Sequence, residues 1–243
     1  MITGPPRQTG DEPVIPDFGQ GSDCVRENRL FCWDWVRDHW DDTLQPALLE
    51  HVELTVIAVT IGFGISFAAA LLAYRLRWLE APFGLFAAFL YTVPSLALFQ
   101  LLVPVTGLTV TTVEIALVGY TLLILFRNTL AGLLAVPEDV REAARGMGLS
   151  PTQSLLRVEL PLALPAILAG LRIATVTTIS LATVAAFVLP DGLGAPIFDA
   201  LRTFFKTKFI AAGLLAVALA VVADALLALV ARAATPWARA RGA

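Results

Sequence analysis

The chain has 243 residues, of which 57% are hydrophobic and only 15% are charged. An average soluble domain carries about a quarter charged residues, so a water-soluble fold could not bury this much apolar surface. The net charge of −3 also excludes the strongly basic surface that a nucleic-acid partner requires. The apolar residues gather in runs of membrane-spanning length, and the predicted class is an all-α polytopic membrane protein.

Residues 1–50 precede the first apolar run and are predicted to form an extracytoplasmic segment with a disordered start. Residues 1–29 are polar and rich in Pro and Gly, and they lack the basic start and apolar core of a secretory signal, so no cleavage is expected. The two cysteines, Cys24 and Cys32, are close enough in the sequence to close a small disulfide loop, although they could also be two unrelated thiols. An oxidising compartment favours the disulfide.

A short amphipathic helix is predicted just before the first span. Trp33, Val36, Trp40 and Leu44 recur near helical spacing, with charged residues on the other faces. This pattern is typical of a helix that lies on the outer leaflet, and a docking surface for a soluble partner is the alternative. His39 has no second ligand at metal-binding spacing, so no metal site is assigned.

Five apolar runs are each long enough to cross a hydrocarbon core of about 30 Å at about 1.5 Å per residue. They are residues 52–74, 82–104, 110–134, 162–189 and 209–231. The basic residues that flank them on one side are Arg75, Arg77, Arg141, Arg145, Arg157, Arg232, Arg239 and Arg241. Because cytoplasmic flanks are enriched in Lys and Arg, these positions predict an outside N-terminus and a cytoplasmic C-terminus. The transmembrane domain is therefore expected at 51–232, with a cytoplasmic tail at 233–243, in the inner (plasma) membrane of a prokaryote.

Several polar or helix-bending residues fall inside the predicted spans. Pro94 in span two and Pro165 in span four are predicted to bend their helices. The candidates for lining a translocation path are Tyr91, Pro94, Thr175, Thr178 and Ser180. For the hydroxyl groups of span four, a hydrogen bond to the helix's own backbone or to a neighbouring helix is an equally good interpretation.

Three charged residues lie deep in the spans, all nearer the cytoplasmic end: Arg127, Arg172 and Asp224. Charges at such depth usually pair or extend toward the interface. A structural ion pair between Asp224 and one of the two arginines is expected, in preference to a role in binding a solute.

The most informative segment is the polar stretch 137–161 between spans three and four, which reads as a capped helical hairpin. Pro137 suits a first helical position, and Gly148 suits a left-handed cap at the end of the first helix. Ser150 and Gln153 match a capping box that starts a second helix, which is expected to end by Pro161. A stiff hairpin in place of a short connection predicts a cytoplasmic docking element.

The residues of this hairpin resemble the EAA signature of the permeases of binding-protein-dependent ABC importers. The matching positions are Glu142, Ala143, Ala144, Gly148, Val158, Leu160 and Pro161, and only Val158, in place of Ile, departs from the usual form. The resemblance implies the type I ABC importer permease fold, with five transmembrane helices and a cytoplasmic EAA hairpin that docks on an ATPase.

Further stretches resemble the glycine betaine, carnitine and choline branch of these permeases. They are residues 91–97, 126–132 and 164–172, whereas 188–194 departs from a usually more glycine-rich turn. The resemblance implies a transport subunit for compatible solutes such as glycine betaine, carnitine, choline or proline. It also implies three partners: an ABC ATPase dimer, a second permease of the same or a different chain, and an extracytoplasmic solute-binding protein.

The chain has no Gly-x4-Gly-Lys-Ser/Thr phosphate loop, so ATP hydrolysis is assigned to a separate subunit, and neither a catalytic residue nor a cofactor is expected. Three alternatives remain: a permease for methionine or another amino acid, a secondary transporter and a membrane scaffold. A secondary transporter would show an internal repeat and ionisable residues near the bilayer centre. A scaffold would have no reason to carry the full EAA spacing.

Overall fold

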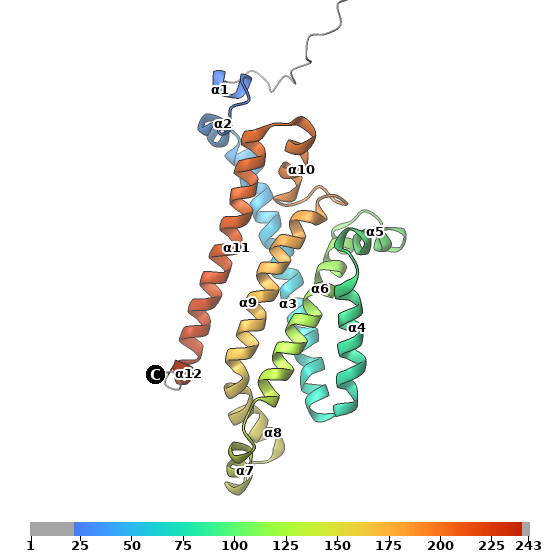
Figure 1. The fold of residues 1–243 in the computed structure, drawn as a ribbon, viewed down its shortest axis with the longest axis vertical. Helices are drawn as coiled ribbons and strands as arrows, with labels where there is room; N and C mark the ends of the chain where they lie inside the picture. The colour runs from blue at the N-terminus through green and yellow to red at the C-terminus, as the bar shows by residue number, and fades with distance from the viewer. Residues whose placement is uncertain (1–21, 240–243) are drawn as a thin grey trace, which may run out of the picture.

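The computed structural model describes residues 22–239, which form an elongated bundle of helices (Figure 1). Its long helices are α3 (Gln45–Arg75), α6 (Val110–Leu134), α9 (Leu160–Ala185) and α11 (Lys206–Ala234). Within the described residues, four helices are long and apolar enough to cross a membrane, and a fifth span is completed if α4 (Glu80–Thr92) and α5 (Ser95–Thr106) count as one. The prediction of an all-α polytopic membrane protein is confirmed.

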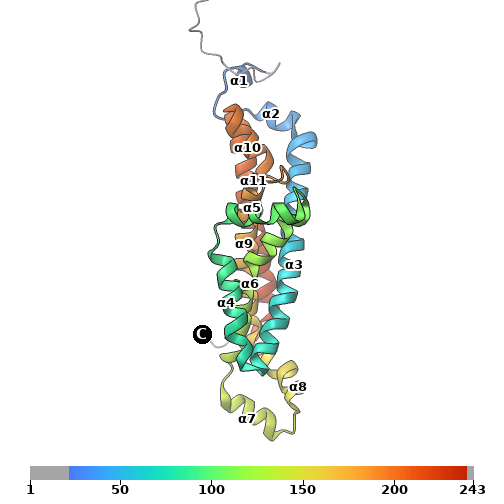
Figure 2. The ribbon, with the colours of Figure 1, turned by 90° about the vertical axis from the view of Figure 1, so that its right-hand side faces the viewer.

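The second predicted span is broken rather than bent. α4 and α5 meet at Val93 and Pro94 with an angle of 101° between them, and α5 lies across the end of α4 (Figure 2). Pro94 cannot donate a backbone hydrogen bond and forces the residue before it into an extended conformation, which Val93 adopts at φ −66° and ψ 129°. The Tyr120 hydroxyl of α6 donates to the Val93 carbonyl at 2.6 Å, which fixes the break against the bundle.

Pro161 behaves differently from expectation, because α9 continues through it. The second hairpin helix was expected to end by Pro161, but α8 (Pro151–Ser154) runs through a π-helical turn, Leu155–Glu159, directly into α9. A proline ring clashes with the carbonyl four residues earlier in a regular α-helix, and the wider π turn relieves that crowding. Pro165 lies inside α9, which continues past it, and the bend expected there stays a prediction.

The centre of the bundle is the packing of α3, α6 and α9. A Cβ atom at Gly132 of α6 would lie 2.9 Å from the Ala166 Cβ of α9, and one at Gly170 of α9 would lie 2.5 Å from the Asn128 Cβ of α6. Small residues at both positions therefore let the two backbones approach closely, as is common between membrane helices. A cluster of buried side chains from α3, α5, α6 and α9 fills the half of the bundle away from the hairpin: Leu54, Ala58, Phe99, Val113, Ala116, Leu117, Ala182 and Ala185.

The short elements before α3 pack on the beginning of α11. They are α1 (Asp23–Arg26), α2 (Trp33–Asp38) and a π-helical turn, Trp40–Leu44. The single amphipathic face expected here is wrong: Val36 and Leu44 are buried, Trp33 and Trp40 are exposed, and Trp35 from the other face is buried. The helix breaks at His39 and resumes as a wider turn, so residues before and after the break no longer share one face.

α11 is attached to the bundle mainly through α9 and α10 (Gly194–Thr203), and a four-residue helix, α12 (Pro236–Arg239), follows it. Its buried residues, Thr207, Ala211 and Ala212, all lie in its first two turns. Farther along, the Arg172 guanidinium of α9 donates two hydrogen bonds to the Asp224 carboxylate, at 2.9 and 2.8 Å. This bidentate ion pair is therefore a polar link between the second half of α11 and the bundle.

Replacing either partner of this pair by Ala should loosen α11. We expect a coupling energy of about 1 kcal/mol in a double-mutant cycle of Arg172→Ala and Asp224→Ala, because interhelical hydrogen bonds between membrane helices are of that size. Thermal unfolding of the purified protein measures it. Leu226→Ala, at an exposed position of the same helix, is the control and should change stability little. Strictly additive effects of the two Ala variants would contradict the assigned link.

Candidate functional site

The predicted hairpin projects from one end of the bundle, between α6 and α9 (Figures 1 and 2). Its first helix is α7 (Glu138–Gly146), which begins after Pro137. The Glu138 carboxylate accepts hydrogen bonds from Arg145 at 2.6 Å and Arg141 at 2.9 Å. These two hydrogen bonds, of which the one from Arg145 has the larger effect, lower the pKa of Glu138. The carboxylate therefore stays ionised, and the three charges stiffen α7.

The turn after α7 has the geometry that its sequence predicts. Gly148 adopts φ +82°, its N–H donates to the Arg145 carbonyl at 2.9 Å, and the Leu149 N–H donates to the Ala144 carbonyl at 3.2 Å. This pair of hydrogen bonds is the Schellman pattern, in which the left-handed residue is favoured to be glycine.

α8 begins with the predicted capping box. The Gln153 N–H donates to the Ser150 hydroxyl at 3.4 Å, and the Ser150 N–H donates to the Gln153 side chain at 2.9 Å. Hydrogen bonds therefore fix both the end of the first hairpin helix and the start of the second, which are only a few residues apart.

A buried polar cluster at the base joins the hairpin to the spans. Glu159 is only 6% exposed, and its carboxylate accepts hydrogen bonds from the Ser154 hydroxyl at 2.8 Å and from the Tyr74 hydroxyl at the end of α3. Nearby, Arg75 donates to the Thr152 hydroxyl at 3.3 Å. Because a carboxylate buried without partners is costly, this cluster fixes how the hairpin leaves the bundle.

Sequence reasoning missed this cluster, since Glu159 occupies the variable position of the Val158-Glu159-Leu160-Pro161 stretch. The available signal was a carboxylate between apolar neighbours in what proves to be a continuous helix. Arg141 adds a further link, because it donates to the Leu133 carbonyl of α6 at 3.1 Å.

The signature residues do not all face the same way. Glu142 and Ala143 are exposed, as is Met147 at 72%, whereas Ala144 is only 1% exposed and lies inside the hairpin. Val158, Leu160 and Pro161 are partly buried where the π turn joins α9. The exposed signature residues therefore lie on α7 and in the turn after it, and the later signature residues lie where the hairpin joins α9.

The five candidates for a translocation path do not form one site. Thr175 and Thr178 are buried and donate to carbonyls of their own helix, those of Leu171 and Ala174, each at 2.8 Å. Ser180 is exposed on α9. Tyr91 and Pro94 lie at the α4–α5 break, where the Tyr91 ring packs edge-on against that of Tyr120.

Of the three deep charges, the structure pairs Arg172 with Asp224 and leaves Arg127 elsewhere. Arg127 lies on an exposed position of α6, in a groove shared with α4. No carboxylate within residues 22–239 forms an ion pair with it.

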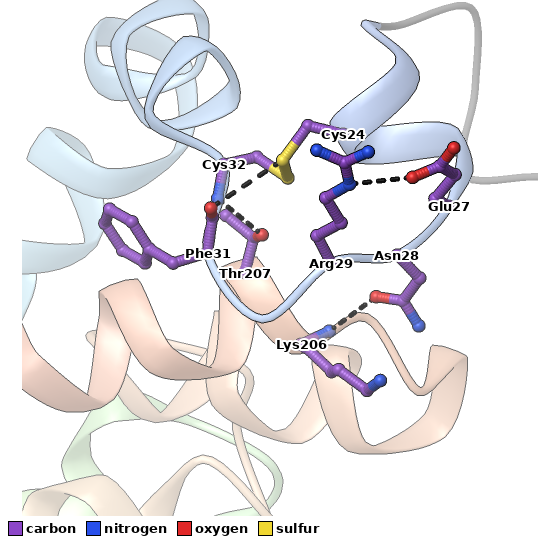
Figure 3. Close-up of a disulfide and its surroundings, with 8 residues drawn as sticks. All are labelled: Cys24, Glu27, Asn28, Arg29, Phe31, Cys32, Lys206 and Thr207. Carbon is purple, nitrogen blue, oxygen red and sulfur yellow. Dashed lines mark hydrogen bonds and ion pairs between the residues drawn. A yellow bond between two sulfur atoms is a disulfide. The ribbon is translucent and has the colours of Figure 1, made fainter.

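At the opposite end from the hairpin, the segment before α2 forms a loop closed by a disulfide between Cys24 and Cys32 (Figure 3). The Asn28 side chain accepts a hydrogen bond from the Lys206 N–H at 3.1 Å and donates one to the Phe204 carbonyl at 2.8 Å. The Cys32 N–H donates to the hydroxyl of buried Thr207 at 3.0 Å. We call residues 24–32 the clasp, because they hold the α10–α11 turn.

A bundle of membrane-length helices with a capped EAA hairpin between two of its spans defines the permease class of ABC importers. The match to known families agrees: residues 60–236 fit the model of the binding-protein-dependent transport system inner membrane component, and the chain belongs to this family. It is a transport subunit, and a separate ATPase subunit hydrolyses ATP in these systems.

Named relatives cover most of the chain. Choline transport system permease protein OpuBB of Bacillus subtilis (strain 168) is 32% identical over 77% of this chain and 86% of that protein. Osmoprotectant import permease protein OsmW of Salmonella typhimurium is 35% identical over 76% of this chain and 88% of that protein. An inward-facing structure of the MetNI methionine ABC transporter matches with a TM-score of 0.70 at 21% identity, over 82% of this chain and 98% of that one, which shows the shared fold.

The left-handed cap at Gly148 can be tested by replacing Gly148 with Ala and, for comparison, Gly146 with Ala. Gly148→Ala should weaken the hairpin by about 1 kcal/mol, because a Cβ is unfavourable in this conformation. Gly146→Ala should strengthen α7 by up to about 1 kcal/mol, because Gly146 is helical and a Cβ there meets nothing within 4 Å. Hydrogen exchange of amides 138–149 reports both, and the same direction of change in the two variants would contradict the cap.

Opening the clasp should free the α10–α11 turn. In Cys24→Ser/Cys32→Ser the loop loses a constraint worth about 2–3 kcal/mol in the unfolded segment. We expect faster tryptic cleavage at Arg26, Arg29 and Lys206 of the purified protein. Asn28→Ala, which keeps the disulfide, should accelerate cleavage at Lys206 alone. Unchanged cleavage at Lys206 in both variants would show that the clasp does not hold the turn.

Proposed function

We propose that this chain is the permease of an ATP-driven importer for osmoprotectants of the choline, glycine betaine and carnitine class. Support for the substrate class comes from relatives such as OpuBB and OsmW, whose names state transport of choline and import of osmoprotectants. Support for the ATP-driven mechanism comes from one observation above all, the fixed hairpin with its exposed α7 surface.

We further propose that the hairpin end is cytoplasmic and the N-terminus is outside. Arg75, Arg77, Arg141, Arg145 and Arg157 all lie in the segments at that end, and cytoplasmic flanks are enriched in Arg. The disulfide-closed clasp lies at the opposite end, where an extracytoplasmic compartment would keep it oxidised.

In this assignment α7 contacts an ABC ATPase dimer, and a solute-binding protein delivers the solute at the clasp end. The hairpin is suited to transmit motion because its caps and the Glu159 cluster leave it little freedom relative to α6 and α9. Four or five spans provide too little wall to enclose a path, so a second permease, of the same or a different chain, completes it. Closure of the ATPase dimer would then rock the two permeases about the path.

The choice of solute is tested by uptake in a strain that lacks this chain. Uptake of radiolabelled glycine betaine, choline or carnitine should fall to background and return with the wild-type gene, and methionine uptake should be unchanged. The converse pattern, with methionine uptake lost and the three osmoprotectants taken up normally, would replace the proposed substrate class by the amino-acid alternative.

A further inference from the structure

A groove runs along the surface between α4 and α6, at the end of the bundle that carries the hairpin. It has a volume of about 690 Å³. Most of its lining is apolar, and its three charged residues are Arg77 and Glu80 at the α3–α4 connection and Arg127 on α6. The lining residues are Arg77, Glu80, Ala81, Gly84, Leu85, Phe126, Arg127, Leu130, Ala131 and Leu134.

Two guanidinium groups, those of Arg77 and Arg127, line this groove. Arg77 precedes α4 in a short 3-10 turn, Arg77–Leu79, and Arg127 lies on α6 well inside a predicted span. Neither forms an ion pair with a carboxylate in the part of the chain that the structure describes, although Glu80 also lines the groove. The site therefore carries a net charge of +1 and has two unused sets of donors, which is the local chemistry that recognises a phosphate group.

The surroundings of the groove are those of a lipid-facing surface. Trp78, beside Arg77, is 70% exposed, as is typical of aromatic residues at the level of the headgroups. Leu85 is 72% exposed, and Phe86 and Phe89 continue the exposed apolar row along α4. An intramembrane arginine is costly unless it is paired or extends to the interface, and an anion in the groove would supply a counter-charge that residues 22–239 do not provide.

We propose that this groove binds one anionic phospholipid, with its phosphate between Arg77 and Arg127 and an acyl chain along Gly84 and Leu85. The two arginines, together with the exposed Trp78 at one end of the apolar row of α4, favour a lipid over a second permease. The inference depends on the orientation proposed above only in placing the lipid in the cytoplasmic leaflet. Because Leu134 ends α6 and the hairpin follows at once, the bound lipid contacts the helix end from which α7 projects.

Native mass spectrometry of the purified full-length chain tests this proposal, with dioleoyl-phosphatidylglycerol and dioleoyl-phosphatidylcholine as the probes. The wild type should retain one phosphatidylglycerol in preference to phosphatidylcholine. Arg77→Gln and Arg127→Gln should each lower its retention by about fivefold, the value of one basic residue near an anionic headgroup. Arg37→Gln, which removes an exposed arginine from α2, is the matched control and should have no effect.

The acyl-chain part is tested separately by Gly84→Leu, which should lower retention of both lipids. A Cβ at Gly84 makes only ordinary contact with Phe126, at 3.7 Å, so α4 tolerates the change while the larger side chain fills the groove. Gly64→Leu, at a position on α3 where a Cβ meets nothing within 4 Å, is the matched control. Excess inorganic phosphate should not displace the lipid, whereas displacement would assign the site to a free anion.

A measurement on the wild type keeps the proposal testable if a variant fails to fold. A photoreactive phosphatidylglycerol should label peptides that contain residues 77–85 or 127–134. Labelling elsewhere, equal retention of the two lipids, or a disulfide between two copies of Leu85→Cys would overturn the proposal, the last by assigning the groove to a second copy. Lipid retention is measured without transport. The lipid proposal can therefore fail while the uptake experiment supports the proposed function, and the proposed function can fail while lipid retention is observed.

Discussion

The close approach of α6 and α9 is the constraint on which the rest of the structure depends. Gly132 and Gly170 let the two backbones come together, and the Asn128 side chain fills the space beside Gly170. The hairpin is the connection between these two helices, so its position and direction follow from their register. A larger residue at either glycine would force the helices apart and move the hairpin with them.

The hairpin adds its own constraints to that register. The Schellman turn at Gly148 and the capping box at Ser150 fix its internal angle, and Glu159 ties its base to Tyr74 at the end of α3. The end of α3 and the helical segment that leads into α9 therefore meet at one buried carboxylate. Arg141 of α7 also donates to the Leu133 carbonyl of α6, so the hairpin is tied to the ends of three spans, which suits the proposed role as a coupling element.

Much of this arrangement could be predicted from the sequence because it is local. The long apolar helices, the left-handed Gly148 and the capping box follow from short-range patterns that the chain satisfies within a few residues. The outcome at the prolines could not be predicted in the same way. The bend at Pro94 was expected, but the hydrogen bond from the Tyr120 hydroxyl to the Val93 carbonyl that fixes it comes from another helix, and Pro161 continues its helix because a π turn precedes it.

Which side chains are buried and which charges pair could likewise not be predicted from local sequence patterns. Ala143 and Ala144 are equivalent as letters, yet the first is exposed and the second is buried, because the hairpin folds back on Ala144. Two arginines within the predicted spans could have paired with Asp224. The packing of α9 against α11 brings Arg172 to it. Arg127 instead faces a groove that the periodicity of apolar residues in the sequence does not predict.

The most direct test of the central claim, that α7 couples this chain to its ATPase, is the association of purified ATPase with Ala143→Trp. Ala143 is exposed, so the larger side chain should leave the fold and its melting temperature unchanged while it blocks the docking surface. Thr203→Trp, at an exposed position of α10 at the opposite end, is the matched control. The account predicts that Ala143→Trp weakens ATPase binding at least about tenfold, the equivalent of about 1.4 kcal/mol, and that Thr203→Trp does not. Wild-type ATPase binding and wild-type uptake by Ala143→Trp would contradict it.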